Sequence, residues 1–163
     1  MSFYFIKNVI YSKHEVIILI YTEKTKLALN ICFDAHKEQV DKSGVPYVFH
    51  PFHLAEQMET EETVIVALLH DVVEDCDVTV EQLTALGFDK TVTDAIKLLT
   101  HGSGLSDEEY LRYVKIIKEN PVARKVKLAD LRHNSDITRL DKVDEKALKR
   151  RNKYLQAISI LEE

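Results

Sequence analysis

The sequence predicts an all-α domain, and three observations support this fold class. From Thr22 onward apolar side chains recur at helical spacing, as where Leu27, Ile31 and Ala35 share one face. Residues that start or stop helices recur between these periodic segments. The alternating pattern typical of strands is confined to the first 21 residues, and no repeat, linker or low-complexity segment divides the rest. We therefore expect a compact bundle of about seven or eight helices.

Capping and breaking residues set the expected helix ends. Gly44 and Pro46 break the first helix, and Pro51 and Pro121 can each occupy the first position of a new one. Thr60 is a suitable N-cap, because the acidic residues after it favour the positive end of a helix. In chain order, the predicted helices cover residues 22–39, 51–58, 60–75, 78–86, 92–100, 107–119, 121–135 and 145–161.

Residues 1–21 are expected to form an extension separate from the domain of residues 22–163. Two short apolar segments in it, Phe3–Ile6 and Val16–Ile20, predict a short β-hairpin. The uninterrupted apolar stretch 16–21 is far too short to span a bilayer, which takes about 20 residues. No signal-peptide cleavage site follows it, and the pattern points to no function for this extension.

The composition is that of an ordinary cytoplasmic globular protein. Of the 163 residues, 45% are hydrophobic and 30% are charged, which suits one domain with a substantial core. The net charge of −5 argues against an extended nucleic-acid surface but allows a small phosphorylated ligand held by local cations. Cys32 and Cys76 form no CxxC pair and no disulfide framework, as expected in a reducing cytoplasm. We expect a small-molecule partner, no nucleic acid and no membrane, with homo-oligomerisation left open.

The segment His70–Asp75 is the most informative feature of the chain. It places four ionisable side chains at the end of the apolar run Val64–Leu69. On a helix Asp71 and Asp75 share a face, where like charges repel by roughly 0.2–0.5 kcal/mol, and acids near a helix C-terminus oppose the macrodipole. A buried unpaired charge would cost far more. A cation is therefore expected beside these residues, and a divalent metal ion is the simplest candidate.

Two further residues are candidate metal ligands. Asp130 lies in an apolar neighbourhood with Val126 and Leu128, where an acid has little structural reason to be. His36 lies near the end of the first predicted helix and is either a ligand or an ordinary surface or core histidine. Imidazole and carboxylate groups that converge from separate helices suit a first-row metal ion, so the order His, His-Asp, Asp along the chain predicts a metal site.

These residues lie in stretches that resemble the HD-domain metal-dependent phosphohydrolases, and among them the (p)ppGpp hydrolase domain of RelA/SpoT-type proteins. The resemblance covers residues 22–160, in order and with compatible spacing. It implies a compact HD-domain helical bundle, and the size resembles that of a stand-alone small alarmone hydrolase. The matching stretches are Ala35–Gln39, Ser43–Pro51, Ala67–Asp75 and Val126–Asp130, followed by His133-Asn134.

The resemblance implies roles for individual residues. It implies a metal ion that is usually Mn²⁺, although two imidazoles and two carboxylates suit several first-row ions. The metal would activate water and polarise a phosphoryl oxygen. Glu74 and Asp75 match the pair that positions or deprotonates the attacking water, as general acid and base. The implied metal ligands are His36, His70, Asp71 and Asp130.

Substrate contacts are implied by the same resemblance. Lys42 and Ser43 match positions that hold the phosphates of the nucleotide, and Asn134 matches a residue near the sugar and the metal. Lys127 either adds positive charge to the pocket or is solvated. His50 matches the family's His-Pro pair, where we expect packing or hydrogen bonding rather than metal ligation.

Three departures from the family pattern weaken the inference to guanine. Asp41 stands where the hydrolases commonly carry an Arg that contacts the guanine, and an acid cannot stack as a guanidinium does. Ser135-Asp136-Ile137 replaces a Met-Arg-Thr run, and Leu131-Arg132 reverses the more usual order. The residues implied for the metal and the water are all present.

The resemblance implies hydrolysis of the 3′-pyrophosphate of (p)ppGpp to GTP or GDP plus pyrophosphate. One alternative keeps this chemistry but applies it to another nucleotide or a phosphorylated cofactor. A second alternative is a non-catalytic sensor that binds an alarmone or a metal ion. The presence of Glu74 and Asp75 argues against the sensor, because a degenerate member should lose such residues first.

Overall fold

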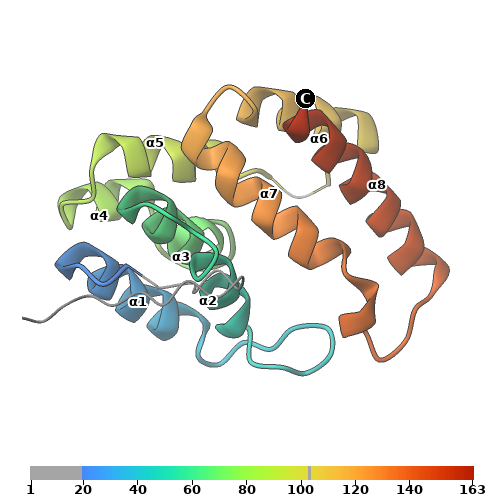
Figure 1. Cartoon of the computed structure of the whole chain (residues 1–163). Coiled ribbons are helices and arrows are strands. Elements are labelled where there is room, and N and C mark those ends of the chain that lie inside the picture. The colour runs from blue at the N-terminus through green and yellow to red at the C-terminus, as the bar shows by residue number, and fades with distance from the viewer. Residues whose placement is uncertain (1–19, 103) are drawn as a thin grey trace, which may run out of the picture.

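The apolar run Val64–Leu69 forms the centre of the fold. In the computed structural model, which describes residues 20–102 and 104–163, this run lies in helix α3 (Glu61–Asp75), and every side chain in it is buried. A helix that is apolar on all sides needs neighbours on all sides. Helices α1, α2, α5 and α7 supply them by packing around α3 (Figure 1).

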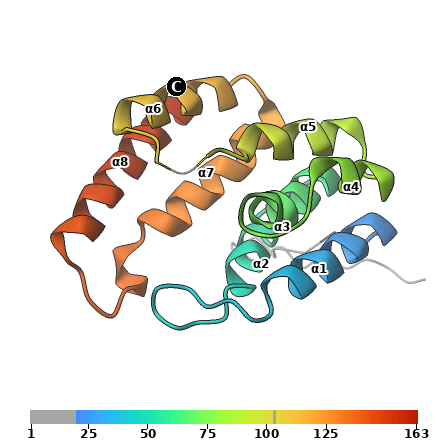
Figure 2. The same ribbon diagram turned by 180° about the vertical axis from the view of Figure 1, so that it is seen from behind.

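Two more helices cover the other side of α7. Helix α8 packs on both α7 and α6, and both views show this layer on the side of α7 that faces away from α3 (Figures 1 and 2). The short helix α4 packs against α5. In chain order the described elements are α1 (Glu23–His36), α2 (Phe49–Ala55), α3 (Glu61–Asp75), α4 (Val80–Ala85), α5 (Lys90–Leu99), α6 (Asp107–Ile117), α7 (Pro121–Ser135), the 3₁₀ helix η1 (Ile137–Arg139) and α8 (Glu145–Glu162).

Side-chain caps fix where most of these helices begin. Thr22, Thr60, Thr79 and Ser106 each accept a hydrogen bond from the backbone N–H three residues later, and each completes a capping box. Asn120 caps α7, whose first turn contains a proline. Because these signals are local, they are visible in the sequence, and the predicted starts of α6 and α7 agree with the structure.

The loop between α1 and α2 reaches across to the end of α7. Gly44 has a φ of 79°, a left-handed conformation that favours glycine. The backbone N–H of Asp41 donates to the Val45 carbonyl at 2.8 Å and closes the turn. The Ser43 hydroxyl donates to the Arg139 carbonyl in η1 at 2.9 Å, which joins the loop to a residue 96 positions later.

The all-α prediction is confirmed, and the differences lie at the helix ends. Helix α2 begins at Phe49 rather than at Pro51. The first turn of a helix tolerates Pro51, because a backbone N–H at that position would have no partner within the helix. Helix η1 was not predicted. The predicted hairpin lies outside the described residues, and the division at residue 21 stays a prediction. No helix in residues 20–102 and 104–163 is long and apolar enough to cross a membrane.

Candidate functional site

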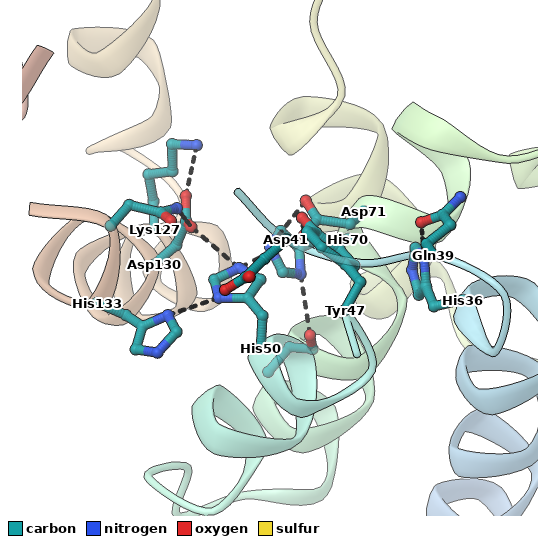
Figure 3. A network of polar contacts seen from close by, with 12 residues as sticks. His36, Gln39, Asp41, Tyr47, His50, His70, Asp71, Lys127, Asp130 and His133 are labelled. Carbon is teal, nitrogen blue, oxygen red and sulfur yellow. Dashed lines mark hydrogen bonds and ion pairs between the residues drawn. The ribbon is translucent and has the colours of Figure 1, made fainter. Parts of the chain in front are cut away.

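Four side chains from three helices converge beside the C-terminal half of α3. Nitrogen and oxygen atoms of His50, His70 and Asp71 all lie within 4.8 Å of one another. His50 Nε2 also lies 3.4 Å from Asp130 Oδ1 and 3.5 Å from Asp71 Oδ2. Figure 3 shows His50 between Asp130 on one side and His70 and Asp71 on the other. Two imidazoles and two carboxylates therefore face one point from α2, α3 and α7.

His70 has the hydrogen bonding expected of a metal ligand. Its Nδ1 lies 2.9 Å from the Ala67 carbonyl, which can only accept, so Nδ1 carries the proton. Its buried Nε2 makes no hydrogen bond, although it lies 3.0 Å from Asp71 Oδ1. A buried polar atom without a partner is costly, and a ligating histidine commonly donates its other nitrogen in this way. The cluster can therefore hold a divalent metal ion, which its donor set suits.

Asp130 is held as an ionised carboxylate within α7. Burial would raise its pKa, but the Lys127 charge and the contacts with His50 and His70 hold the pKa well below its usual value. Lys127 Nζ donates to Asp130 Oδ2 at 2.8 Å, and Asn134 donates to Oδ1. Both Lys127 and Asp130 are almost completely buried. Burial lowers the pKa of Lys127, but the charge of Asp130 outweighs it and the pKa is raised.

The other ligand candidates are also held in place by hydrogen bonds. The Tyr47 hydroxyl donates to Asp71 Oδ2 at 2.6 Å. Burial lowers the pKa of His50, but the hydrogen bond to Asp130 and the charges of Asp130 and Asp71 outweigh it, so the pKa is raised. The two carboxylates therefore favour a positive charge on or beside the His50 ring, whether a second proton or a bound cation.

Glu74 and Asp75 lie one turn beyond the ligand candidates, at a cavity of about 290 Å³. Burial raises the pKa of both carboxyls, and the charge of Asp71 adds to this effect. Glu74 Oε1 lies 3.7 Å from His101 Nδ1, and His101 lines the same cavity. Carboxyls with raised pKa values beside a candidate metal site are candidates for proton transfer.

A second cavity, of about 380 Å³, adjoins the first. Tyr47, Asn134 and Tyr154 line both. Lys42 and Arg150 lie in the second cavity, and burial, followed by the charges of Arg150 and Lys146, lowers the pKa of Lys42. These positive side chains are grouped together although the chain as a whole has a net charge of −5. An anionic ligand would relieve their mutual repulsion.

The sequence profile of the HD domain matches residues 28–133, the part of the chain that contains all four converging side chains. The chain belongs to the HD domain family.

Curated proteins similar to this chain are much longer than it. A guanosine-3′,5′-bis(diphosphate) 3′-pyrophosphohydrolase of Vibrio cholerae is 54% identical over 56 residues, which are 32% of this chain and 8% of the relative. The protein of the same name from Aquifex aeolicus is 31% identical over 119 residues, 68% of this chain and 17% of the relative. The bifunctional (p)ppGpp synthase/hydrolase SpoT of Escherichia coli is 30% identical over 124 residues, which are 69% of this chain and 18% of SpoT. The chain thus spans less than a fifth of these relatives.

A solved structure has the same HD-domain fold. It is described as a metazoan ortholog of SpoT that hydrolyses ppGpp and plays a role in starvation responses. The two structures superpose with a TM-score of 0.70 over 87% of this chain and 85% of the other, at 24% sequence identity. This likeness establishes the arrangement of the helices.

The structure brings His70, Asp71 and Asp130 together as expected, with His50 among them. His36 ends α1, and its ring faces Tyr47 with the centroids 5.0 Å apart. Its Nδ1 is bonded to Gln39 Oε1 at 2.8 Å, and its buried Nε2 has no hydrogen bond. No nitrogen of His36 is among the donor atoms that converge at the HD pair. Like His70, His36 thus combines a bonded Nδ1 with a buried Nε2 that has no hydrogen bond among the described residues, and its assignment as a ligand stays a prediction. The contact of His50 with His133 agrees with the hydrogen bonding expected for it, whereas the position of its Nε2 beside two carboxylates was not predicted.

The substrate-contact candidates lie near the cluster, but several are already engaged. Asn134 and Lys127 both bind Asp130, so Lys127 is neither solvated nor free. Lys42 faces the second cavity, and the Ser43 hydroxyl is bonded within the fold.

Sequence reasoning overlooked several residues that line the two cavities. Tyr47 could have been found, because it lies in the matching stretch Ser43–Pro51 and its hydroxyl needs a hydrogen-bond partner. Nothing local marks the others, because segments far apart in the chain bring them to the site. They are His101, Arg139, Arg150 and Tyr154.

Proposed function

We propose that this chain hydrolyses the 3′-pyrophosphate of (p)ppGpp, giving GTP or GDP and pyrophosphate, at a metal centre formed by His50, His70, Asp71 and Asp130. The observation that carries the proposal is the convergence of these donor atoms beside two carboxyls with raised pKa values. The names of the curated relatives support the choice of substrate. We propose Mn²⁺ as the metal, on the family resemblance.

The chain's own residues would then perform most of the reaction. When bound, the metal ion supplies Lewis-acid polarisation of the phosphoryl oxygen and activation of water. Glu74, with Asp75, would accept a proton from the attacking water as its oxygen bonds to the phosphorus nearest the ribose. The bond from that phosphorus to the ribose 3′ oxygen breaks, and the proton passes to this oxygen. Acid–base catalysis of this kind contributes typically about 10²–10⁴-fold.

The cations of the second cavity would hold the rest of the nucleotide. Lys42 and Arg150 face the space that adjoins the reaction site and could pair with its phosphates. Asn134 lies between the two cavities and is proposed to contact the sugar. Ser43 is proposed to contribute through its position on the loop, and Lys127 through the charge that it adds beside Asp130. A cytoplasmic location and a purely small-molecule partner belong to the same proposal, supported by the acidic net charge.

The test is anion-exchange chromatography of ppGpp after incubation with the purified chain and Mn²⁺. We expect GDP and pyrophosphate as products, no reaction in EDTA, and a rate reduced about 10²–10⁴-fold in Glu74→Gln. Hydrolysis of another phosphorylated nucleotide but not ppGpp would replace the substrate and keep the chemistry. Binding of ppGpp by the Mn²⁺-loaded chain without any product would favour the sensor and overturn the enzyme.

A further inference from the structure

His101 reaches the reaction cavity from the segment that joins α5 to α6. It lines the cavity of about 290 Å³ together with Glu74 and Asp75. Its Nδ1 lies 3.7 Å from Glu74 Oε1. The side chains of His101 and Glu74 are 24% and 28% exposed, so water reaches both. A histidine and a carboxyl group thus face the same reaction space from two separate segments of the chain.

Two tyrosines of α6 hold the ring of His101 in this position. The Tyr113 ring meets it edge-on, with the centroids 4.8 Å apart and the planes at 81°, and the Tyr110 ring does so at 6.0 Å and 86°. The Tyr113 hydroxyl donates to the Leu99 carbonyl at 2.5 Å, which ties this ring to the end of α5. Edge-to-face packing of this kind favours a defined ring orientation. The orientation of His101 is therefore set by the fold.

The contacts of His101 leave one ring nitrogen available for proton transfer. Nδ1 lies 3.1 Å from the Gly102 carbonyl, which can only accept, so Nδ1 carries a proton. Within residues 20–102 and 104–163 no hydrogen bond or ion pair involves Nε2. Imidazole is the side chain that gains and releases protons most readily near neutral pH. The titratable groups that face this ring or its cavity are Asp71, Glu74 and Asp75 from α3, Tyr110 and Tyr113 from α6, Lys127 and Asp130 from α7, Lys153 and Tyr154 from α8, and Tyr47 from the loop before α2.

We propose that His101 is the acid that protonates the leaving ribose 3′ oxygen. This role rests on the proposed hydrolysis and adds a catalytic residue to it. The oxygen of the attacking water bonds to the phosphorus nearest the ribose while Glu74 takes a proton from that water. As the bond from this phosphorus to the 3′ oxygen breaks, His101 Nε2 gives its proton to the oxygen, which leaves as a hydroxyl group. Glu74 then returns its proton to His101 through water, so each turnover consumes one water molecule and restores both side chains.

The other groups at the cavity are less suited to this step. An alkoxide is a strong base, so the ribose oxygen needs a proton as it leaves. Glu74 must begin ionised to take a proton from water, and it cannot donate one at the same moment. Lys127 is held in its ion pair with Asp130 at 2.8 Å. Burial raises the pKa of Tyr110 to about 12, which makes its hydroxyl a weaker acid. His101 lacks these restrictions.

The test is the pH dependence of kcat and KM for ppGpp with Mn²⁺ in the wild type, His101→Gln and His53→Gln. Glutamine cannot release a proton, so His101→Gln should lower kcat about 10²–10⁴-fold, change KM less than about threefold and remove the basic limb of the kcat profile. His53→Gln is the matched control, because His53 lines a different cavity, of about 590 Å³, in which Glu74 has no part. Its kcat should stay unchanged.

An ester with a good leaving group separates proton donation from positioning. In bis(p-nitrophenyl) phosphate the leaving nitrophenolate is stabilised by its nitro group and needs no proton. With this substrate and Mn²⁺, Glu74→Gln should still lower the rate, because water must lose a proton in either reaction. His101→Gln should lower the hydrolysis of ppGpp alone.

Thermal unfolding checks that each variant folds, and His101→Asn, with a shorter amide, gives a second measurement. An unchanged kcat or a retained basic limb in these variants would overturn the role of His101 and leave the hydrolase standing. Equal losses with ppGpp and the nitrophenyl ester would also overturn it, because they would indicate that the ring positions Glu74 instead. A wild-type chain that hydrolysed neither substrate would overturn the proposed function itself.

Discussion

Among single residues, Lys127 and Asp130 form the charge pair on which the candidate site depends most. Both side chains are almost fully buried, and each shifts the pKa of the other toward its charged form. A buried carboxylate that lost this partner would keep its desolvation cost without compensation. The lysine therefore maintains the ionised Asp130 that a metal ion would require.

We predict that Lys127→Met lowers the free energy of unfolding in EDTA by about 3–5 kcal/mol. Saturating Mn²⁺ should recover part of this loss, because the metal charge compensates Asp130. Lys125→Met is the matched control: Lys125 pairs with Glu59 at 3.3 Å on the surface, and its loss should cost less than about 1 kcal/mol. Urea unfolding of both variants gives the comparison. Equal losses in the two would contradict the account of Lys127.

A substitution at His101 tests whether Glu74 accepts the proton, through the pH dependence of hydrolysis. A protonated His101 lowers the pKa of Glu74, whereas burial raises it. If Glu74 is the proton acceptor, His101→Phe should raise its pKa and move the acidic limb of kcat/KM to higher pH. Glu74→Gln should remove that limb. The measurement is the pH dependence of hydrolysis with Mn²⁺, and an acidic limb that moved to lower pH in His101→Phe would exclude this role for Glu74.

The helices and their caps could be predicted because their signals are local. Thr60, Ser106 and Pro121 mark helix starts within a few residues of sequence, and the structure agrees with them at α3, α6 and α7. The position of His50 beside His70 could not be predicted in this way. His36 and His50 both lie close to the same Gly-Pro loop, and only the packing of α2 on α3 brings the His50 ring to His70.

The loop that connects these two histidines has its own conformational requirement. Gly44→Ala should lower the free energy of unfolding by about 1–2 kcal/mol, because Gly44 has a φ of 79°. Gly102→Ala is the control, since a methyl group added at either position would have no other atom within 4 Å and Gly102 has no left-handed φ. Urea unfolding measures both. A control variant that lost as much stability as Gly44→Ala would contradict the backbone explanation.

On the scale of the whole molecule, the fold matters because it packs α1, α2 and α7, which carry His36, His50 and Asp130, around the helix that carries His70 and Asp71. The family, the fold class and three of the four converging side chains could be predicted from sequence motifs. The cavities, the Asp41–Arg139 ion pair and the contact between His50 and His133 could not, because each depends on residues that are far apart in the chain.

The central claim is that His50, rather than His36, completes the metal centre with His70, Asp71 and Asp130. The most direct test is Mn²⁺ binding to the wild-type chain, His50→Gln and His36→Gln, measured by calorimetry, with thermal unfolding in EDTA as the folding control. We predict one Mn²⁺ per wild-type chain, an affinity more than about tenfold weaker in His50→Gln, and little change in His36→Gln. Weakened binding in His36→Gln together with unchanged binding in His50→Gln would contradict the account.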